Sequence, residues 1–115
     1  MCAVFFDSKK VFCANVGDSR AVLFSQGKKQ TIKVTPISED HKPSLPNEKK
    51  RVLSMNGRVE PIQGQNGQWL GPERVWMKNE DTPGLAMSRS LGDGLAHSVG
   101  VSSEPGKFCS PIIFV

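Results

Sequence analysis

Three short segments carry side chains that could take part in chemistry, and none is a self-contained catalytic set. Arg20 follows a Gly-Asp-Ser turn and could bind a phosphate group, although an arginine at a strand end more often pairs with a carboxylate or with water. His41 could act as an acid or base, but it has no partner at close spacing, which favours loop packing. Ser88 and Arg89 lie outside any nucleophile elbow, phosphate-binding glycine loop or histidine pair at ligand spacing.

The three cysteines do not form a recognisable metal-binding or disulfide pattern. Cys2, Cys13 and Cys109 share no short spacing, and an odd number of cysteines without a Cys-x-x-Cys pair argues against a zinc site or a disulfide scaffold. Cys13 lies in an alternating apolar run, where a free cysteine usually packs as a small hydrophobic residue. We therefore expect reduced, structural thiols.

Length and composition indicate one folded domain. The chain has 115 residues, of which 37% are hydrophobic and 23% charged, so it can form a core and is not a disordered tail. No apolar run approaches the ~20 residues of a membrane helix. The N-terminus lacks the pattern of a secretory signal. We expect a soluble intracellular protein, cytoplasmic or nuclear, with no membrane partner.

The basic charge is too dispersed to predict a nucleic-acid interface. Fifteen Lys and Arg residues outnumber eleven Asp and Glu residues, which gives a formal net charge of +4. These residues occur as scattered pairs and one triplet, at residues 49–51, rather than as a stripe with aromatic side chains between them. We expect no nucleic-acid partner.

The N-terminal third is predicted to form strands joined by tight turns. The strand-like runs cover residues 2–6, 11–16, 20–25 and 30–35. Turn-forming residues such as Asp-Ser-Lys-Lys separate them, and connections this short join antiparallel neighbours. The sequence therefore predicts an antiparallel β-meander.

One central helix is predicted after the meander. Ser44 is a suitable cap, Pro46 and Glu48 suit a first turn, and Gly57 can end the helix. The residues expected to face the sheet are Val52, Leu53 and Met55.

A long flap-like loop is predicted over residues 58–83, which are rich in glycine and proline. Trp69 and Trp76 are its only large anchors. The apolar run at residues 112–115 is predicted to be a further strand. Strands, helix and loop together indicate an α+β fold.

Several segments, taken in order, resemble the metal-dependent serine/threonine protein phosphatases of type 2C, the PPM family. The first and most specific is Ala-Asn-Val-Gly-Asp-Ser-Arg-Ala-Val-Leu at residues 14–23. The others are Asp-His-Lys-Pro at 40–43, residues 48–51, Asn-Gly-Arg-Val at 56–59, Pro-Gly-Leu-Ala-Met-Ser-Arg-Ser-Leu-Gly-Asp at 83–93, and residues 100–105. The resemblance covers essentially the whole chain and implies part of a β-sandwich flanked by helices.

The resemblance also implies a metal-dependent reaction on phosphoserine and phosphothreonine proteins. The family's two Mg²⁺ or Mn²⁺ ions are held mainly by an Asp-Gly-His-Gly segment upstream and by Asp-Gly-Leu-Trp-Asp and Asp-Asn segments downstream, none of which occurs here. Residues 1–115 are thus expected to be a partial domain without its metal-binding ends, with no catalytic residue and no tightly bound metal. The alternative is a non-catalytic, phosphatase-like interaction module.

Individual residues acquire expected roles from the same resemblance. Asp18 corresponds to a weak third metal site, although in this chain alone a turn-forming role is favoured. Arg20, His41, Trp69 and Trp76 are candidates for the substrate side or flap. The residues expected to hold the motifs in shape are Gly17, Ser19, Ser88, Arg89, Gly92 and Asp93.

The family sandwich places a second layer over the strands, and its other segments are absent from this sequence. We therefore expect large side chains to remain partly exposed and to promote self-association through the sheet. These residues include Phe5, Phe12, Val22 and Ile32.

Overall fold

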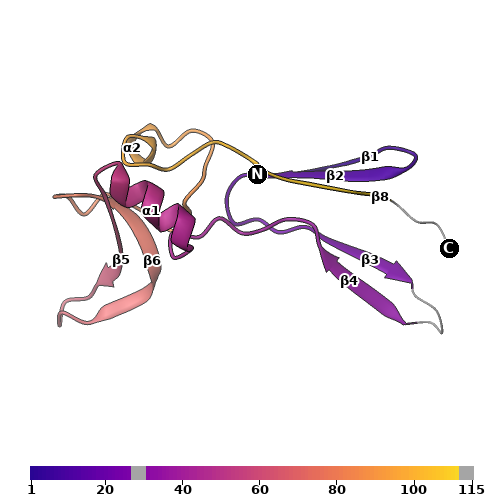
Figure 1. Ribbon diagram of the computed structural model, residues 1–115. Coiled ribbons are helices and arrows are strands. Elements are labelled where there is room, and N and C mark those ends of the chain that lie inside the picture. Colours follow the sequence, from indigo (N-terminus) through magenta and orange to yellow (C-terminus); the bar gives the residue numbers. More distant parts are fainter. Residues whose placement is uncertain (27–30, 112–115) are drawn as a thin grey trace. The chain divides into compact units, whose positions relative to one another are not determined.

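A computed structural model describes residues 1–26 and 31–111 and divides the chain into two compact units (Figure 1). One unit comprises residues 1–40 together with 105–115, and the other comprises residues 41–104. The apolar run at 112–115, for which a strand was predicted, lies outside the described residues. No helix among the described residues is long and apolar enough to cross a membrane.

The first unit contains a three-stranded antiparallel sheet in the order β1-β2-β8. Its strands are β1 (Cys2–Phe6), β2 (Lys10–Asn15) and β8 (Gly106–Pro111). A tight turn joins the first two, because the amide of Asp7 donates to the carbonyl of Lys10 at 2.9 Å. The hydrophobic cluster of this unit is formed by Val11, Cys13 and Ile37, against which Leu23 and Phe108 pack.

The other two strands of this unit form a separate hairpin, β3 (Val22–Gln26) with β4 (Ile32–Pro36). The predicted meander is therefore divided into two hairpins. The reason is that the second neighbour of β2 is β8 and not β3, although β8 begins 91 residues after β2 ends. Tight turns indicate which consecutive strands can pair, but they do not exclude a distant strand from the second edge.

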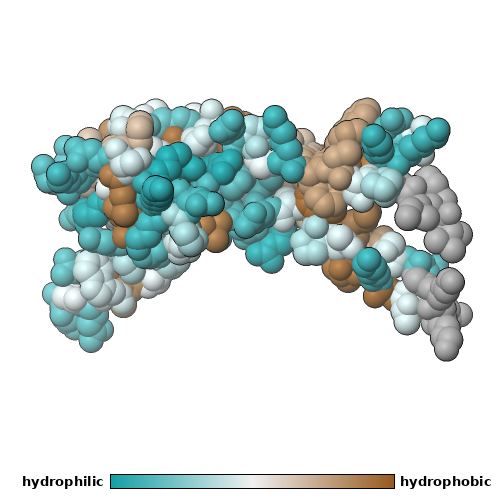
Figure 2. All heavy atoms as spheres, in the orientation of Figure 1, coloured by the Kyte–Doolittle hydropathy of each residue, from teal (hydrophilic) through white to brown (hydrophobic). Residues whose placement is uncertain are grey.

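Large apolar side chains on both sheets of this unit are exposed, as the sequence predicted. Phe5 and Phe12 lie opposite each other on β1 and β2, with ring centroids 6.3 Å apart, and Phe5 is 66% exposed. On the second hairpin Phe24 is 65% and Ile32 72% exposed. Brown, hydrophobic spheres on the surface over these strands in Figure 2 correspond to this apolar exposure.

The second unit packs a helix against a sheet in the order β5-β6-β7. Its elements are α1 (Pro46–Ser54), β5 (Gly57–Gln63), β6 (Trp69–Met77), β7 (Pro83–Leu85) and α2 (Gly94–His97). The core consists of small apolar residues from the helices, the strands and the segment after α2: Val52, Val59, Val75, Ala96, Val99 and Val101. The mixture of antiparallel sheets and two helices is the expected α+β class.

Three local predictions about α1 need correction. The N-cap is Leu45, without a side-chain hydrogen bond, instead of Ser44, because the proline at position 46 fixes the first helical residue. Val52 is fully buried as predicted, but Leu53 lies one helical step away from that face and is exposed. Met55 is exposed because it is the C-cap, where the backbone has already left the helix.

Residues 58–83 are largely an antiparallel hairpin of β5 and β6, although composition predicted a loop. Gly64 and Gly67 close its turn, with the amide of Gly64 donating to the carbonyl of Gln68 at 2.8 Å. A register shift lies between Glu60 and Ile62. The glycines and prolines mark this turn and irregularity, while the buried pair Val59 and Val75 sits where the strands are regular.

Candidate functional site

A buried asparagine shapes the Gly-Asp-Ser turn at the end of β2. The Nδ2 group of Asn15 donates to the carbonyl oxygens of Gly17, at 3.1 Å, and Glu39, at 2.9 Å. Its Oδ1 atom is buried without a hydrogen-bond partner. Asn15 thus ties the turn to the segment that follows β4. Sequence reasoning did not single it out, although a polar residue in phase with buried Val11 and Cys13 was the available signal.

Arg20 and Asp40 form a bidentate ion pair beside this turn. Nε and Nη2 of Arg20 donate to Oδ1 and Oδ2 of Asp40, each at 2.9 Å. The hydrogen bonds that Arg20 donates to Asp40, together with the charge of Asp40, raise the pKa of Arg20. The arginine side chain is 64% exposed, so solvent screens the pair and its contribution to stability is small. The structure therefore uses Arg20 as the partner of a carboxylate.

Asp18 is half-buried on the turn, between buried Gly17 and exposed Ser19. Within residues 1–26 and 31–111, no three side chains of the His, Cys, Asp and Glu types come together as metal ligands. A hard cation such as Mg²⁺ or Mn²⁺ needs several oxygen ligands around it. The residues present here therefore do not fit a two-metal centre.

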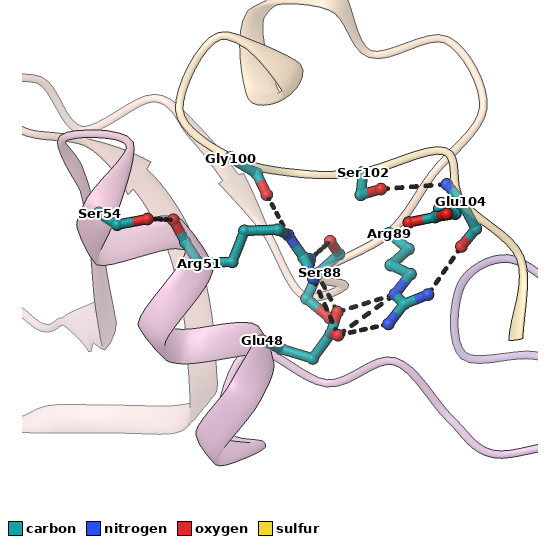
Figure 3. Close-up of polar contacts among 8 residues, drawn as sticks. All are labelled: Glu48, Arg51, Ser54, Ser88, Arg89, Gly100, Ser102 and Glu104. Carbon is teal, nitrogen blue, oxygen red and sulfur yellow. Dashed lines mark hydrogen bonds and ion pairs between the residues drawn. The ribbon is translucent and has the colours of Figure 1, made fainter.

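The second unit is organised around one buried carboxylate, that of Glu48 in the first turn of α1 (Figure 3). Arg51 donates to both of its oxygens, from Nη1 to Oε1 at 2.9 Å and from Nη2 to Oε2 at 2.8 Å. Arg89 donates from Nη2 to Oε1 at 2.7 Å, and the hydroxyl of Ser88 donates to Oε2 at 2.6 Å. Glu48 is only 4% exposed.

The two arginines extend this network to the backbone of neighbouring segments. Arg51 donates from Nε to the carbonyl of Gly100 and from Nη2 to that of Ser88, both at 2.8 Å. Arg89 donates from Nη1 to the carbonyl of Glu104, also at 2.8 Å. Helix α1, the segment around Ser88 and the segment at 100–104 are therefore held by one set of charge-assisted hydrogen bonds. We call Glu48, Arg51, Ser88 and Arg89 the Glu48 network.

This network lowers the pKa of Glu48 well below its ordinary value of 4.5. Burial alone would raise the pKa, but hydrogen bonds from Arg51, Arg89 and Ser88 and the charge of Arg51 outweigh burial. At pH values where the unfolded chain takes up a proton at this position, the folded chain keeps the carboxylate ionised.

A depressed folded-state pKa predicts a loss of stability in acid. The contribution of Glu48 to the free energy of unfolding is fully present above pH 4.5 and declines as the pH falls toward the folded-state pKa. We expect the urea midpoint of the parent chain to fall more steeply than that of Glu48→Gln between roughly pH 5 and pH 3. This range is the span around an ordinary glutamate pKa. Equal slopes for the two proteins would contradict the role given to Glu48.

The remaining predicted residues of this unit have structural contacts. The buried residue His41 accepts, at its carbonyl, a hydrogen bond of 3.0 Å from the amide of Ser88. Asp93 is the N-cap of α2 with a positive φ of 47°, directly after Gly92 with a φ of 85°. These positions shape the chain between the Glu48 network and α2.

The two tryptophans lie on the β5-β6 hairpin in different environments. Trp76 is half-buried, donates from Nε1 to the carbonyl of Glu60 at 2.8 Å, and has the Arg58 guanidinium 5.7 Å from its ring centroid. Trp69 is 55% exposed near the tip. Trp76 therefore anchors the hairpin, while Trp69 is the more exposed of the two tryptophans and can contact another molecule.

Comparison with known proteins identifies the family to which these antiparallel sheets, the Gly-Asp-Ser turn and the β5-β6 hairpin belong. The family model "Protein phosphatase 2C" matches residues 1–109. The chain is 42% identical over 98 residues to "Probable protein phosphatase 2C 61" of Arabidopsis thaliana, covering 84% of this chain and 28% of that protein. It is 38% identical over 105 residues to "Probable protein phosphatase 2C 12" of Oryza sativa subsp. japonica, covering 91% and 26%.

Solved structures agree on the fold. A serine-threonine phosphatase 2C from Toxoplasma gondii superposes with a TM-score of 0.77 at 21% identity, covering 96% of this chain and 36% of that one. A Caenorhabditis elegans sex determining protein gives 0.70 at 26% identity, covering 97% and 23%. The chain belongs to the protein phosphatase 2C family. It spans about a quarter of the length of the curated relatives it matches.

Proposed function

We propose that residues 1–115 form part of a phosphatase domain that hydrolyses phosphoserine and phosphothreonine in proteins with the help of Mg²⁺ or Mn²⁺. The observation that carries this proposal is the family match over residues 1–109, which includes the Gly-Asp-Ser-Arg turn. Low-sequence-identity structural neighbours support the fold of that domain. We further propose that the chain has no nucleic-acid partner, because the basic residues are dispersed along the sequence. An intracellular location without a membrane partner remains a separate proposal from the sequence.

Within such a domain, the described residues act as scaffold. Asn15 holds the turn that carries Asp18, the Arg20–Asp40 pair lies beside that turn, and the Glu48 network joins α1 to the segments around Ser88 and at 100–104. Bound Mg²⁺ or Mn²⁺ ions activate water and neutralise phosphoryl oxygens in this type of chemistry. The described carboxylates do not converge for that purpose, so we assign no catalytic residue in this chain.

The proposal predicts that the isolated 115-residue chain has no phosphatase activity. Its hydrolysis of p-nitrophenyl phosphate in the presence of manganese should equal that of buffer, because no two-metal centre is assembled by the described residues. Turnover that is removed by a chelator and restored by manganese would show that this interpretation of the carboxylates is wrong.

A non-catalytic interaction module is the second candidate function. The observation that favours such a module is the exposed tip of the β5-β6 hairpin, which includes Ile62, Trp69 and Leu70. The genomic reading frame distinguishes the two candidates. The phosphatase would be supported if the frame encodes Asp-Gly-His-Gly upstream and Asp-Gly-Leu-Trp-Asp downstream of these residues. The module would be supported if the frame continues in both directions without these segments.

We also propose that the isolated chain self-associates through the exposed faces of its first unit. Phe5, Phe24 and Ile32 are each 65% exposed or more, and each such side chain forgoes about 1.5–3 kcal/mol of burial. We expect binding of a hydrophobic dye and an apparent mass above the monomer, both reduced in a Phe24→Ser, Ile32→Ser variant. Leu53→Ser, on exposed helix surface of the second unit, is the control. A monomer that binds no dye would contradict the proposal.

A further inference from the structure

Two cysteines that are far from a Cys-x-x-Cys spacing lie together in the sheet of the first unit. Cys2 begins β1 and Cys13 lies in β2, and their Sγ atoms are 3.6 Å apart. In the antiparallel register Cys2 faces Asn15 and Val4 faces Cys13, so the two cysteines are diagonal neighbours on one face. Sequence spacing did not predict this proximity, because it depends on the register of the hairpin.

The two thiols differ in their access to solvent. Cys13 is buried among Val11 and Ile37, whereas Cys2 is half-buried at the start of its strand. Burial, followed by the hydrogen bond and charge interaction with Cys2, raises the pKa of Cys13 to about 11. A small oxidant therefore reaches Cys2 first, and Cys13 lies behind it as the nearest thiol.

The distance between the sulfur atoms is short enough for bond formation after a modest movement. A disulfide bond is about 2.05 Å long, so the sulfurs must approach by roughly 1.5 Å. Cys2 is the first residue of β1, which lies at one end of the order β1-β2-β8 in the described sheet. Rotation of the two side chains, with a small shift of the backbone at Cys2, would supply that movement.

We propose that Cys2 and Cys13 form a redox modification site, in which a peroxide converts the two thiols into a reversible intramolecular disulfide. The sulfur of Cys2 attacks one peroxide oxygen, the O–O bond breaks, and Cys2 becomes a sulfenic acid with release of water. The sulfur of Cys13 then attacks the sulfur of Cys2, the S–O bond breaks, and a second water leaves. Two thiols are oxidised by two electrons and one hydrogen peroxide is reduced.

The third cysteine provides an internal control. Cys109 lies opposite Phe12 on β8, and Phe12 and Cys13 point to opposite faces of β2. Cys109 therefore lies on the other face of the sheet from Cys13. Its thiol is exposed and can form bonds between molecules, so Cys109→Ser removes that route without touching the Cys2–Cys13 pair.

Oxidation would fix the start of β1 to β2 just before the turn. Asn15 follows Cys13 by two residues and lies on the same face of the strand, where it holds the carbonyls of Gly17 and Glu39. The disulfide would thus restrain the strand that leads into the Gly-Asp-Ser-Arg turn. This inference does not depend on the proposed phosphatase activity.

The test uses the full chain carrying Cys109→Ser, treated with hydrogen peroxide, alkylated and digested with trypsin. Lys9 and Lys10 separate the two cysteines, so the peptides 1–9 and 11–20 remain together only if they are bridged. We expect a linked pair that lacks two hydrogen masses and is released by dithiothreitol. Unlinked peptides, with Cys2 overoxidised and Cys13 alkylated, would overturn the proposal, as would linkage found only between two chains.

Single substitutions test the order of the two steps. In Cys13→Ser, Cys109→Ser, Cys2 should be trapped by a sulfenic-acid reagent and no linked peptide should form. In the double variant Cys2→Ser, Cys109→Ser, the oxidation of Cys13 should be at least about tenfold slower than that of Cys2 in the preceding variant, because burial keeps Cys13 protonated. Equal rates for the two cysteines would contradict the assignment of Cys2 as the first thiol to react.

Discussion

Replacing Glu48 with alanine is expected to lower the free energy of unfolding by about 3–5 kcal/mol. The carboxylate is 4% exposed and accepts hydrogen bonds from Arg51, Ser88 and Arg89, so its removal takes a shared buried counter-charge away from both guanidinium groups. A typical domain is stabilised by only about 5–15 kcal/mol, so this loss would unfold a large fraction of a marginal chain.

Tryptophan fluorescence during urea unfolding measures this effect in the second unit, because Trp69 and Trp76 both belong to it. The matched control is Glu73→Ala, which removes another carboxylate that contacts α1. Lys49 pairs with Glu73 at 2.6 Å on the surface, where such pairs contribute about 0–1 kcal/mol. Ser88→Ala should have an intermediate effect, because it removes one hydrogen bond to a charged group, worth about 1.5–3 kcal/mol. Similar losses for Glu48→Ala and Glu73→Ala would contradict the central position of Glu48.

The sequence could predict half of this network. Glu48 and Arg51 are three residues apart in a predicted helix, a spacing that brings side chains together. Ser88 and Arg89 belong to a family block expected to be structural. That Arg89 would reach Glu48, 41 residues earlier, depends on how α1 packs on the sheet, and no local pattern contains that information.

The difference between local sequence patterns and contacts of separate segments also explains the errors in the predicted elements. Apolar runs bounded by turn-forming residues placed β1 and β2 correctly within a residue or so, because each strand's pattern is local. The pairing of β2 with β8 depends on contacts between distant segments. The hairpin at 57–77 pairs neighbouring strands, but its buried residues pack on Val52, Val99 and Val101 from other segments. Proline and glycine content indicated loop over residues 58–83, whereas the buried side chains of Val59 and Val75 decide the structure there.

Gly100→Ala is expected to destabilise the second unit by about 2–5 kcal/mol, the sum of backbone strain and overpacking. Gly100 has a φ of +96°, which residues with a Cβ rarely adopt. A Cβ there would lie 2.9 Å from the Cα of Val52 and 3.2 Å from the carbonyl oxygen of Arg51. Both neighbours are helix α1 backbone and cannot rotate away.

Two other glycines separate the causes of this effect. Gly92 has a φ of +85° but open space where a Cβ would lie, so Gly92→Ala should cost only the strain, about 1–2 kcal/mol. Gly94 has open space and no positive φ, so Gly94→Ala should change stability by less than about 1 kcal/mol.

The order Gly100, Gly92, Gly94 in decreasing loss of unfolding free energy is therefore the expected result, again measured by tryptophan fluorescence in urea. A Gly100→Ala loss no larger than that of Gly92→Ala would mean that α1 can move away from the 98–101 segment. The carbonyl of Gly100 accepts the hydrogen bond of Arg51 Nε at 2.8 Å, so such a movement would also lengthen this contact. Arg51 would then hold the Glu48 carboxylate less firmly. In the Gly100→Ala background, Glu48→Gln should therefore change the acid sensitivity of the urea midpoint less than it does in the parent chain.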